Sequence, residues 1–194
     1  MTAPSVRPVS LTQQIVEAAT AITIQEDWAG LTMGRLASAV GVSRQTIYNE
    51  VGSKPQLAEL IVLTEASKFL DAVNRAFDEH QPDYQAAIHL GAQQVLQMGQ
   101  SNALLRSIVG AVHGVESALL PLLTTQSQGL LTVATSVVST RLQGCGIVRE
   151  RADLVSECVV RLVLSYLMQP SHSPEHTADT ILSVVSPALG SANA

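Results

Sequence analysis

The sequence predicts an all-α protein in which an N-terminal three-helix, helix-turn-helix domain is joined by a long helix to a larger C-terminal helical domain. Apolar residues recur at spacings of three and four along most of the 194 residues, which is the period of one helix face. No alternating strand pattern bounded by hairpin turns occurs. In the segment 31–57, LTMGRLASAVGVSRQTIYNEVGSKPQL, capping residues and glycines mark two short helices and the start of a third. We therefore expect domains at 1–55 and 56–194.

The first predicted helix begins at Ser10 and ends near Trp28. Ser10 and Gln13 have the spacing of a capping box, in which each side chain satisfies a backbone N–H of the other residue. This helix is expected to brace the two short helices that follow it. Four residues form its apolar stripe: Ile15, Ala18, Ala19 and Ile22.

The helix-turn-helix motif is predicted at about residues 32–51. Thr32 caps its first helix, and Gly41 supplies the left-handed turn that ends this helix. Ser43 caps the second helix, and Gly52 closes it. The first of these helices is expected to bury one face, made of Met33, Leu36, Ala37 and Val40.

The second helix of the motif has an inner and an outer face. Ile47 and Val51 are one turn apart and are expected to face the core. Gln45 and Asn49 lie about 160° away around a helix of 100° per residue, so they are expected to point outward. Their amide groups have the geometry for paired hydrogen bonds to adenine.

A long helix is predicted from Ser53, its cap, to about Glu79, with Pro55 in the first turn. Another helix begins after Pro82 and Asp83. Further helical segments follow around 104–112 and 119–138, the second interrupted at Pro121 and Gly129, and the GCG at 144–146 is a stop signal.

The last two predicted helices, at about 150–168 and from Ser173 to about Gly190, carry unusually wide apolar faces. The first is polar only along a narrow stripe, so it is expected to be buried on more than one side. We expect these two helices to form a homodimer interface; the alternative is that they complete the core of the monomer. The stripe is Glu150, Asp153, Glu157, Arg161 and Ser165.

Composition limits the possible functions. The formal net charge of −5 argues against indiscriminate attraction to nucleic acid, so any DNA contact must depend on local placement and dimerisation. The uncharged span 117–140 is too rich in Ser, Thr and Gln to cross a membrane, and the N-terminus has no secretory signal pattern. We expect a cytoplasmic protein without a membrane partner. Cys145 and Cys158 are interpreted as small core residues.

The segment 31–57 resembles the N-terminal domain of the TetR family of bacterial transcriptional repressors. The match includes an A-x-x-x-G-V-S turn, a T-[IL]-Y helix and an S-K-x-x-L start of the next helix. The resemblance implies an all-helical homodimer whose N-terminal domains read a palindromic double-stranded DNA operator and whose C-terminal domain binds a small ligand. The matching residues are Ala37, Gly41, Val42, Ser43, Thr46, Ile47, Tyr48, Ser53, Lys54 and Leu57.

The DNA-binding candidates divide into base-reading and phosphate-binding residues. Gln45 and Asn49 are the candidates for base edges, and Arg44 for a guanine edge or a phosphate. Arg35 is either a backbone contact or an ordinary surface charge. Glu50 departs from the family pattern; we expect it to point toward Lys54 and away from phosphate. The phosphate candidates are Thr32, Ser43, Thr46, Tyr48 and Lys54.

The larger domain is poor in aromatic residues after Tyr84, so a ligand cavity there is expected to be aliphatic and to accept an apolar, acyl-chain-like effector. The five histidines do not have the spacing of a metal site, and no catalytic constellation or cofactor motif occurs, so we expect no metal, no cofactor and no enzymatic activity. The candidates for orienting the effector are Gln94, His113, Gln126 and Tyr166.

Two functions are consistent with these features. The first is a ligand-responsive repressor that binds a palindromic operator as a dimer and is released by a small apolar effector. The alternative is a helical dimeric carrier or sensor of an apolar molecule that does not bind DNA, which Glu50 favours because a carboxylate repels phosphate. Enrichment of palindromic fragments from genomic DNA discriminates between them.

Overall fold

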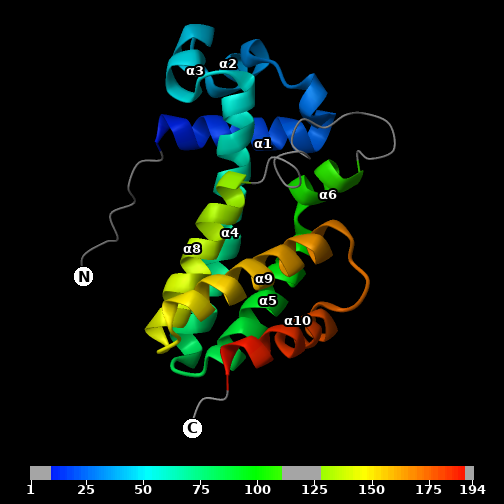
Figure 1. The fold of residues 1–194 in the computed structure, drawn as a ribbon. Helices are drawn as coiled ribbons and strands as arrows, with labels where there is room; N and C mark the ends of the chain where they lie inside the picture. Colours follow the sequence, from blue (N-terminus) through cyan, green and yellow to red (C-terminus); the bar gives the residue numbers. More distant parts are fainter. Residues whose placement is uncertain (1–9, 111–127, 191–194) are drawn as a thin grey trace, which may run out of the picture.

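The computed structural model describes residues 10–110 and 128–190, and every regular element in these ranges is an α-helix. The predicted all-α fold is therefore confirmed. Figure 1 shows α1, α2 and α3 gathered around the first turns of α4, with α5, α8, α9 and α10 around its other end. The helices are α1 Leu11–Gly30, α2 Met33–Val40, α3 Arg44–Val51, α4 Lys54–His80, α5 Tyr84–Ser101, α6 Ala103–Gly110, α8 Gln128–Gly144, α9 Arg149–Met168 and α10 Pro174–Leu189.

The caps of α2 and α3 lie where the sequence predicts them. The Thr32 hydroxyl accepts a hydrogen bond from the Arg35 N–H at the start of α2, and the Ser43 hydroxyl accepts one from the Thr46 N–H at the start of α3. Gly41 has φ +80°, in the left-handed region that a residue with a side chain rarely adopts. The turn between α2 and α3 therefore requires glycine at this position.

The first helix extends two residues beyond its predicted end. Asp27 has φ +63°, which makes a kink inside α1 before the helix ends at Gly30. The kink turns the last carbonyl groups of α1 toward residues of α2 and α4, which bind them as described below.

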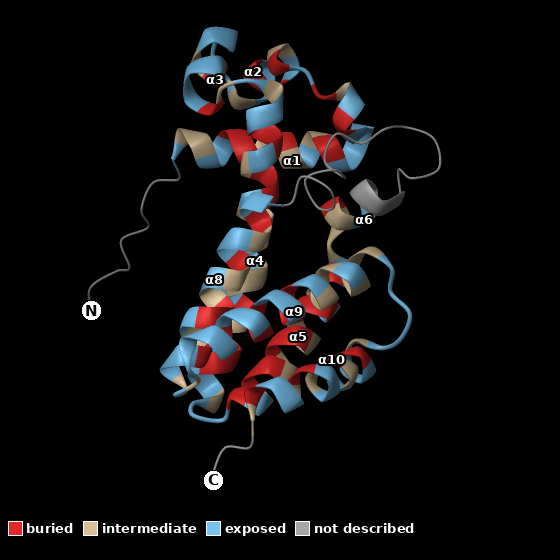
Figure 2. Ribbon diagram, in the orientation of Figure 1, coloured by how far each residue is buried: buried red, intermediate tan, exposed pale blue. Residues whose placement is uncertain are grey.

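The N-terminal core combines residues of the first four helices with two residues from the middle of the chain (Figure 2). Ile15 of α1, Leu36 of α2 and Ile47 of α3 are fully buried against the first turns of α4. Leu104 of α6 and Leu130 of α8 belong to the same cluster of buried residues. The helix-turn-helix is thus packed onto two helices of the larger part of the protein.

The second core lies among α4, α5, α8, α9 and α10. Its most deeply buried members include Phe77, Leu142, Val155 and Ile181. Because α4 has 27 residues, at about 1.5 Å of rise per residue it spans about 40 Å and contributes to both cores. The predicted role of α4 as the connector between the two parts is confirmed.

One expectation about burial is wrong. Cys158 is exposed because it lies on the outer face of α9, whereas Cys145 is half-buried and packs against the second core. Leu154, on the same face of α9, is also exposed. The predicted features at Pro121, His113 and Gln126 lie outside the described residues. No helix in the described part of the chain has the length and hydropathy needed to cross a bilayer.

Candidate DNA-binding surface and ligand cavity

The outer face of α3 carries the side chains predicted to read base edges. Arg44, Gln45 and Asn49 are exposed, while Ile47 is fully buried beneath them. The Gln45 Nε2 donates a hydrogen bond of 2.8 Å to the Asn49 Oδ1, so the two amides lie side by side on one face. Base reading by these two amides stays a prediction, since their groups can pair with an adenine edge.

The hydroxyl-bearing candidates surround this face. Thr32 and Ser43 are exposed although their side-chain oxygens cap α2 and α3, and the Ser43 and Thr46 hydroxyls are 2.8 Å apart. Tyr48 is 44% exposed, so its ring is only partly packed on the protein. Phosphate contacts by these four side chains stay a prediction.

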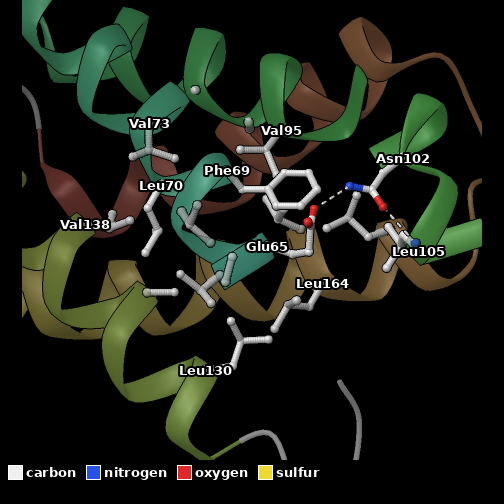
Figure 3. Close-up of a pocket in the computed structure, with 18 of the residues that line it drawn as sticks. Glu65, Phe69, Leu70, Val73, Val95, Asn102, Leu105, Leu130, Val138 and Leu164 are labelled. Atoms are coloured by element: carbon white, nitrogen blue, oxygen red, sulfur yellow. Dashed lines mark hydrogen bonds between the residues drawn. The ribbon is translucent and has the colours of Figure 1, made fainter. Parts of the chain in front are cut away.

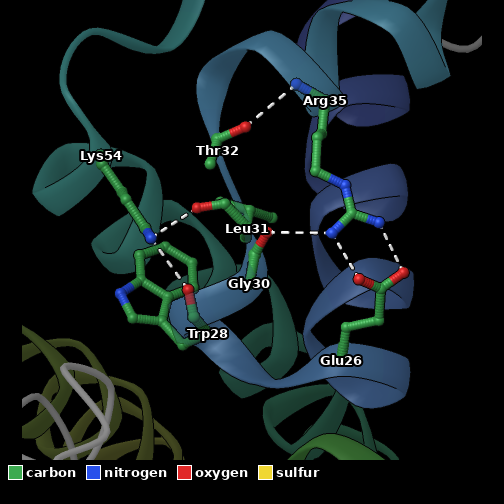
Figure 4. A network of polar contacts seen from close by, with 7 residues as sticks. All are labelled: Glu26, Trp28, Gly30, Leu31, Thr32, Arg35 and Lys54. Atoms are coloured by element: carbon green, nitrogen blue, oxygen red, sulfur yellow. Dashed lines mark hydrogen bonds and ion pairs between the residues drawn. The ribbon is translucent and has the colours of Figure 1, made fainter.

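Arg35 forms an ion pair at the surface of the N-terminal part, with its side chain 48% exposed. Its guanidinium forms a two-pronged ion pair with the Glu26 carboxylate of α1, with 2.6 Å between Nη2 and Oε1, and it also donates to the Gly30 carbonyl (Figure 4). The hydrogen bond from Arg35 lowers the pKa of Glu26. The side chain thus ties α2 to the end of α1, and its contact with the DNA backbone stays a prediction.

Lys54, the first residue of α4, also binds the C-terminal end of α1. Its Nζ donates to the carbonyl oxygens of Trp28 and Leu31 at 2.8 and 2.5 Å and lies 4.9 Å from the centre of the Trp28 ring (Figure 4). A cation at a helix C-terminus also complements the helix dipole. Burial lowers the pKa of Lys54. The ammonium predicted to bind phosphate therefore uses two of its three N–H donors on backbone carbonyl groups.

Glu50 does not point toward Lys54 as expected. Its carboxylate accepts a hydrogen bond from the Thr12 hydroxyl at the start of α1. The sequence spacing of four favoured Lys54 as the partner, but the Lys54 side chain turns away from α3 to reach the end of α1. Glu50 thus links α3 to the first turn of α1.

An apolar cavity of about 120 Å³ lies among α4, α5, α6, α8 and α9 (Figure 3). Aliphatic side chains form most of its wall, in agreement with the aliphatic cavity predicted from composition. The ring of Phe69 adds one aromatic face. The labelled wall residues in Figure 3 include Leu70, Val73, Val95, Leu105, Leu130, Val138 and Leu164.

One polar pair interrupts this wall. The Asn102 Nδ2 donates to the Glu65 Oε2 at 3.0 Å, and the Asn102 Oδ1 accepts from the Leu105 N–H, which caps α6 (Figure 3). The Glu65 side chain is 14% exposed and also accepts from Lys68. Sequence reasoning missed Glu65, although an acid on the apolar stripe of α4, three residues after Val62 and four before Phe69, was a usable signal.

Neither of the two predicted effector-orienting residues within the described ranges lines this cavity. Tyr166 lies in a neighbouring cleft, and Gln94 is half-buried on α5 and lines neither the cavity nor that cleft. His113 and Gln126 lie outside the described residues. On a helix that is apolar around most of its circumference, sequence cannot tell which side faces a cavity.

The described histidines have ordinary partners. The His89 Nε2 is 2.9 Å from the Asp179 Oδ1, which connects α5 to α10. The His80 Nδ1 is 3.1 Å from the Ala76 carbonyl, and the rings of His172 and His176 pack edge to face. Among the residues that the structure describes, no three His, Cys, Asp or Glu side chains gather into a potential metal site.

The helix-turn-helix exposes one face of α3, and the long helix α4 that follows it continues into the wall of an apolar cavity. This is the architecture of a helical DNA-binding transcriptional regulator. Residues 15–61 match the family model described as bacterial regulatory proteins, tetR family, and residues 83–187 match that of the bacterial tetracyclin repressor, C-terminal domain. The chain belongs to the TetR family of DNA-binding transcriptional regulators. The family is regulatory rather than enzymatic.

Several individual proteins are similar over nearly the whole chain. The HTH-type transcriptional regulator AlkX of Mycobacterium tuberculosis is 27% identical over 179 residues, covering 91% of this chain and 84% of that protein. The crystal structure of the TetR family repressor AlkX from Dietzia sp. strain DQ12-45-1b, implicated in biodegradation of n-alkanes, superposes with a TM-score of 0.78 at 26% identity, covering 95% and 97% of the two chains. The repressor QsdR of R. erythropolis, with a TM-score of 0.65 at 16% identity over 95% and 96%, shares the fold.

Proposed function

We propose that this regulator binds a palindromic operator as a homodimer and that a small aliphatic molecule in the cavity among α4, α5, α6, α8 and α9 releases it. The α3 face supports the DNA contacts: Gln45 and Asn49 for bases, and Arg44 for a guanine edge or a phosphate. The two recognition helices of a dimer must enter half-sites about one helical turn apart, near 34 Å.

The apolar wall of the cavity supports an aliphatic effector. At about 120 Å³ it is comparable to an engineered dry cavity of about 150 Å³ that binds benzene. An aliphatic guest gains from leaving water, whereas a polar guest finds only the Glu65 and Asn102 pair. The similar Dietzia repressor is implicated in biodegradation of n-alkanes, which supports the same class of ligand for this chain.

Two leucines provide a route from the cavity to the DNA-binding part. Leu104 of α6 and Leu130 of α8 line the cavity and also belong to the buried cluster that contains α1, α2 and α3. A guest that displaces these side chains acts directly on the packing of α1, in addition to any movement of α4. The ligand then shifts the population toward an arrangement with a different separation of the two α3 helices.

The dimer surface that we propose lies on the outer faces of α9 and α10. Leu154 is 57% exposed and Val184 is 60% exposed, which is unusual for apolar residues on helices whose other faces form a core. Cys158 is exposed on the same side of α9 as Leu154, one turn later. In a dimer through this surface, the Cys158 thiol loses access to solvent.

Thiol labelling tests this surface. In a Cys145→Ser variant, we expect Cys158 to react rapidly at protein concentrations at which sedimentation detects monomer, and slowly where it detects dimer. A Leu154→Glu variant should stay monomeric and react rapidly throughout. Dimerisation with unchanged labelling of Cys158 would place the interface elsewhere.

Selection of genomic DNA fragments tests the function as a whole. We expect the purified protein to enrich a palindrome at low salt, and we expect decane to release the protein from that fragment. Failure to enrich any palindrome while decane still binds would favour the alternative function of an apolar-ligand carrier. Enrichment without any effect of decane would refute the aliphatic effector and leave the DNA-binding function in place.

A further inference from the structure

A second cavity adjoins the apolar one. It encloses about 450 Å³ between the end of α5, α6, the end of α9 and the segment leading into α10. Exposed residues such as Gln100, Pro170 and His172 form part of its rim, so this cavity is a cleft at the surface. Its lining is mixed, with the polar groups of Arg106, Tyr166 and His172 among apolar side chains.

Only two side chains separate the cleft from the apolar cavity. Leu105 and Leu167 line both spaces. Gly99 allows this arrangement, since a Cβ at that position would lie 2.1 Å from the Leu167 Cδ2. A leucine side chain can change rotamer without backbone movement, so a guest can open a passage between the two spaces.

The charged side chains at the two ends differ. The cleft contains the guanidinium of Arg106, whose Nη1 donates to the Gln100 carbonyl at 3.0 Å. No Asp or Glu is among the described residues that line the cleft, and the ion pairs in the described ranges do not include Arg106. The described lining of the apolar cavity has no Lys or Arg, and its one carboxylate, Glu65, is paired with Lys68. An anionic group is therefore attracted to the cleft rather than to the apolar cavity.

We propose that the two cavities form one elongated site for a linear aliphatic chain with a terminal carboxylate, whose tail fills the apolar cavity and whose carboxylate binds Arg106 in the cleft. This inference rests on the proposed function, because it names the class of apolar effector. The inner cavity alone holds about six carbon atoms, by comparison with the benzene-binding cavity of similar size. A longer chain must extend past Leu105 and Leu167, and the cleft is the space that receives it.

Three ten-carbon molecules with different ends test the proposal: decane, decan-1-ol and decanoate. In calorimetric titrations of the full chain, we expect decanoate to bind about tenfold more tightly than decan-1-ol, the size of effect that a charge-assisted hydrogen bond gives. The stoichiometry should be one decanoate per subunit. Hexanoate should bind more weakly than decanoate because its shorter chain does not reach from the apolar cavity to Arg106.

Arg106→Gln and Arg75→Gln are the matched variants. Arg75 is exposed on α4 and lines none of the cavities in the described part of the protein. We expect Arg106→Gln to remove the preference for decanoate over decan-1-ol while decane binding stays unchanged, and Arg75→Gln to keep the preference. Equal affinities for acid and alcohol in the wild type, an unchanged preference in Arg106→Gln, or two decanoates per subunit would each overturn the elongated site. Those results leave the apolar effector intact as long as decane binds. If none of the three ligands binds to the wild type, the aliphatic effector of the proposed function is refuted as well.

Discussion

Replacing Lys54 with methionine separates a role in DNA contact from a role in holding the helix-turn-helix together. Methionine keeps an unbranched apolar stem of similar length but removes the ammonium, so the carbonyl oxygens of Trp28 and Leu31 lose their donor. A hydrogen bond to a charged group contributes about 1.5–3 kcal/mol, and water can replace part of it at this half-buried position. We therefore expect the free energy of unfolding to fall by about 2 kcal/mol, which lowers the melting temperature of a chain of this size by about 4–8 °C.

The salt dependence of operator binding provides the second readout. Each phosphate contact contributes about 0.9 to the slope of log K against log salt concentration, so a dimer that lost two such contacts would lose about 1.8 from the slope. Because the Lys54 ammonium binds α1, we expect Lys54→Met to weaken operator binding without changing the slope. Arg44→Met is the comparison, because Arg44 is exposed at the start of α3 and its loss should reduce the slope without a large change in melting temperature.

The measurements are thermal unfolding of the protein and fluorescence anisotropy of a labelled operator between low and moderate salt. Lys54→Arg preserves the charge, so its salt slope should be close to that of the wild type. Its melting temperature should differ more from the wild type, because the guanidinium has a different shape. An unchanged melting temperature together with a slope reduced by about 1.8 in Lys54→Met would refute the stabilising role of Lys54. It would indicate that Lys54 contacts phosphate.

Three further changes give equally specific results. Glu26→Gln should lower the melting temperature at neutral pH. Because Arg35 lowers the pKa of Glu26, the difference in melting temperature from the wild type should be complete above the ordinary glutamate pKa, about 4.3, and should shrink as acid protonates Glu26. A difference that does not depend on pH would contradict the ion pair. Replacing Gln45 and Asn49 with alanine should relax sequence preference and leave the salt slope unchanged, as measured by repeating the fragment selection; an unaltered preference would exclude base reading by these amides. Ala134→Leu should fill part of the apolar cavity, raise the melting temperature and weaken decane binding in calorimetry, and undiminished decane binding would place the ligand elsewhere.

The sequence predicted the N-terminal helices because their determinants are local. Thr32, Gly41 and Ser43 act within three or four residues of where they stand, so their caps and turn could be predicted from spacing alone. The outward direction of Gln45 and Asn49 follows from the helical period. These features needed no knowledge of how the helices pack.

The roles that sequence could not supply depend on partners far away in the chain. Lys54 binds carbonyl groups 26 and 23 residues earlier, and Glu50 binds Thr12, 38 residues earlier. Such partners are fixed by the kink in α1 and by helix packing rather than by spacing along one helix. The cavity raises the same difficulty, because residues of five helices make its wall, and Tyr166 on an almost entirely apolar helix faces the cleft beside it.

The placement of Leu104 and Leu130 in the N-terminal cluster limits how freely this protein can be recombined with its relatives. A chimera joined near residue 55 would transfer α1, α2 and α3 without the two leucines that complete their core, and would also separate Lys54 from the helix that carries it. An exchange of ligand specificity between such regulators therefore requires the grafted larger part to supply matching side chains at the contact with α1. The DNA-reading part and the ligand-sensing part are interdependent in folding, and we expect them to vary together.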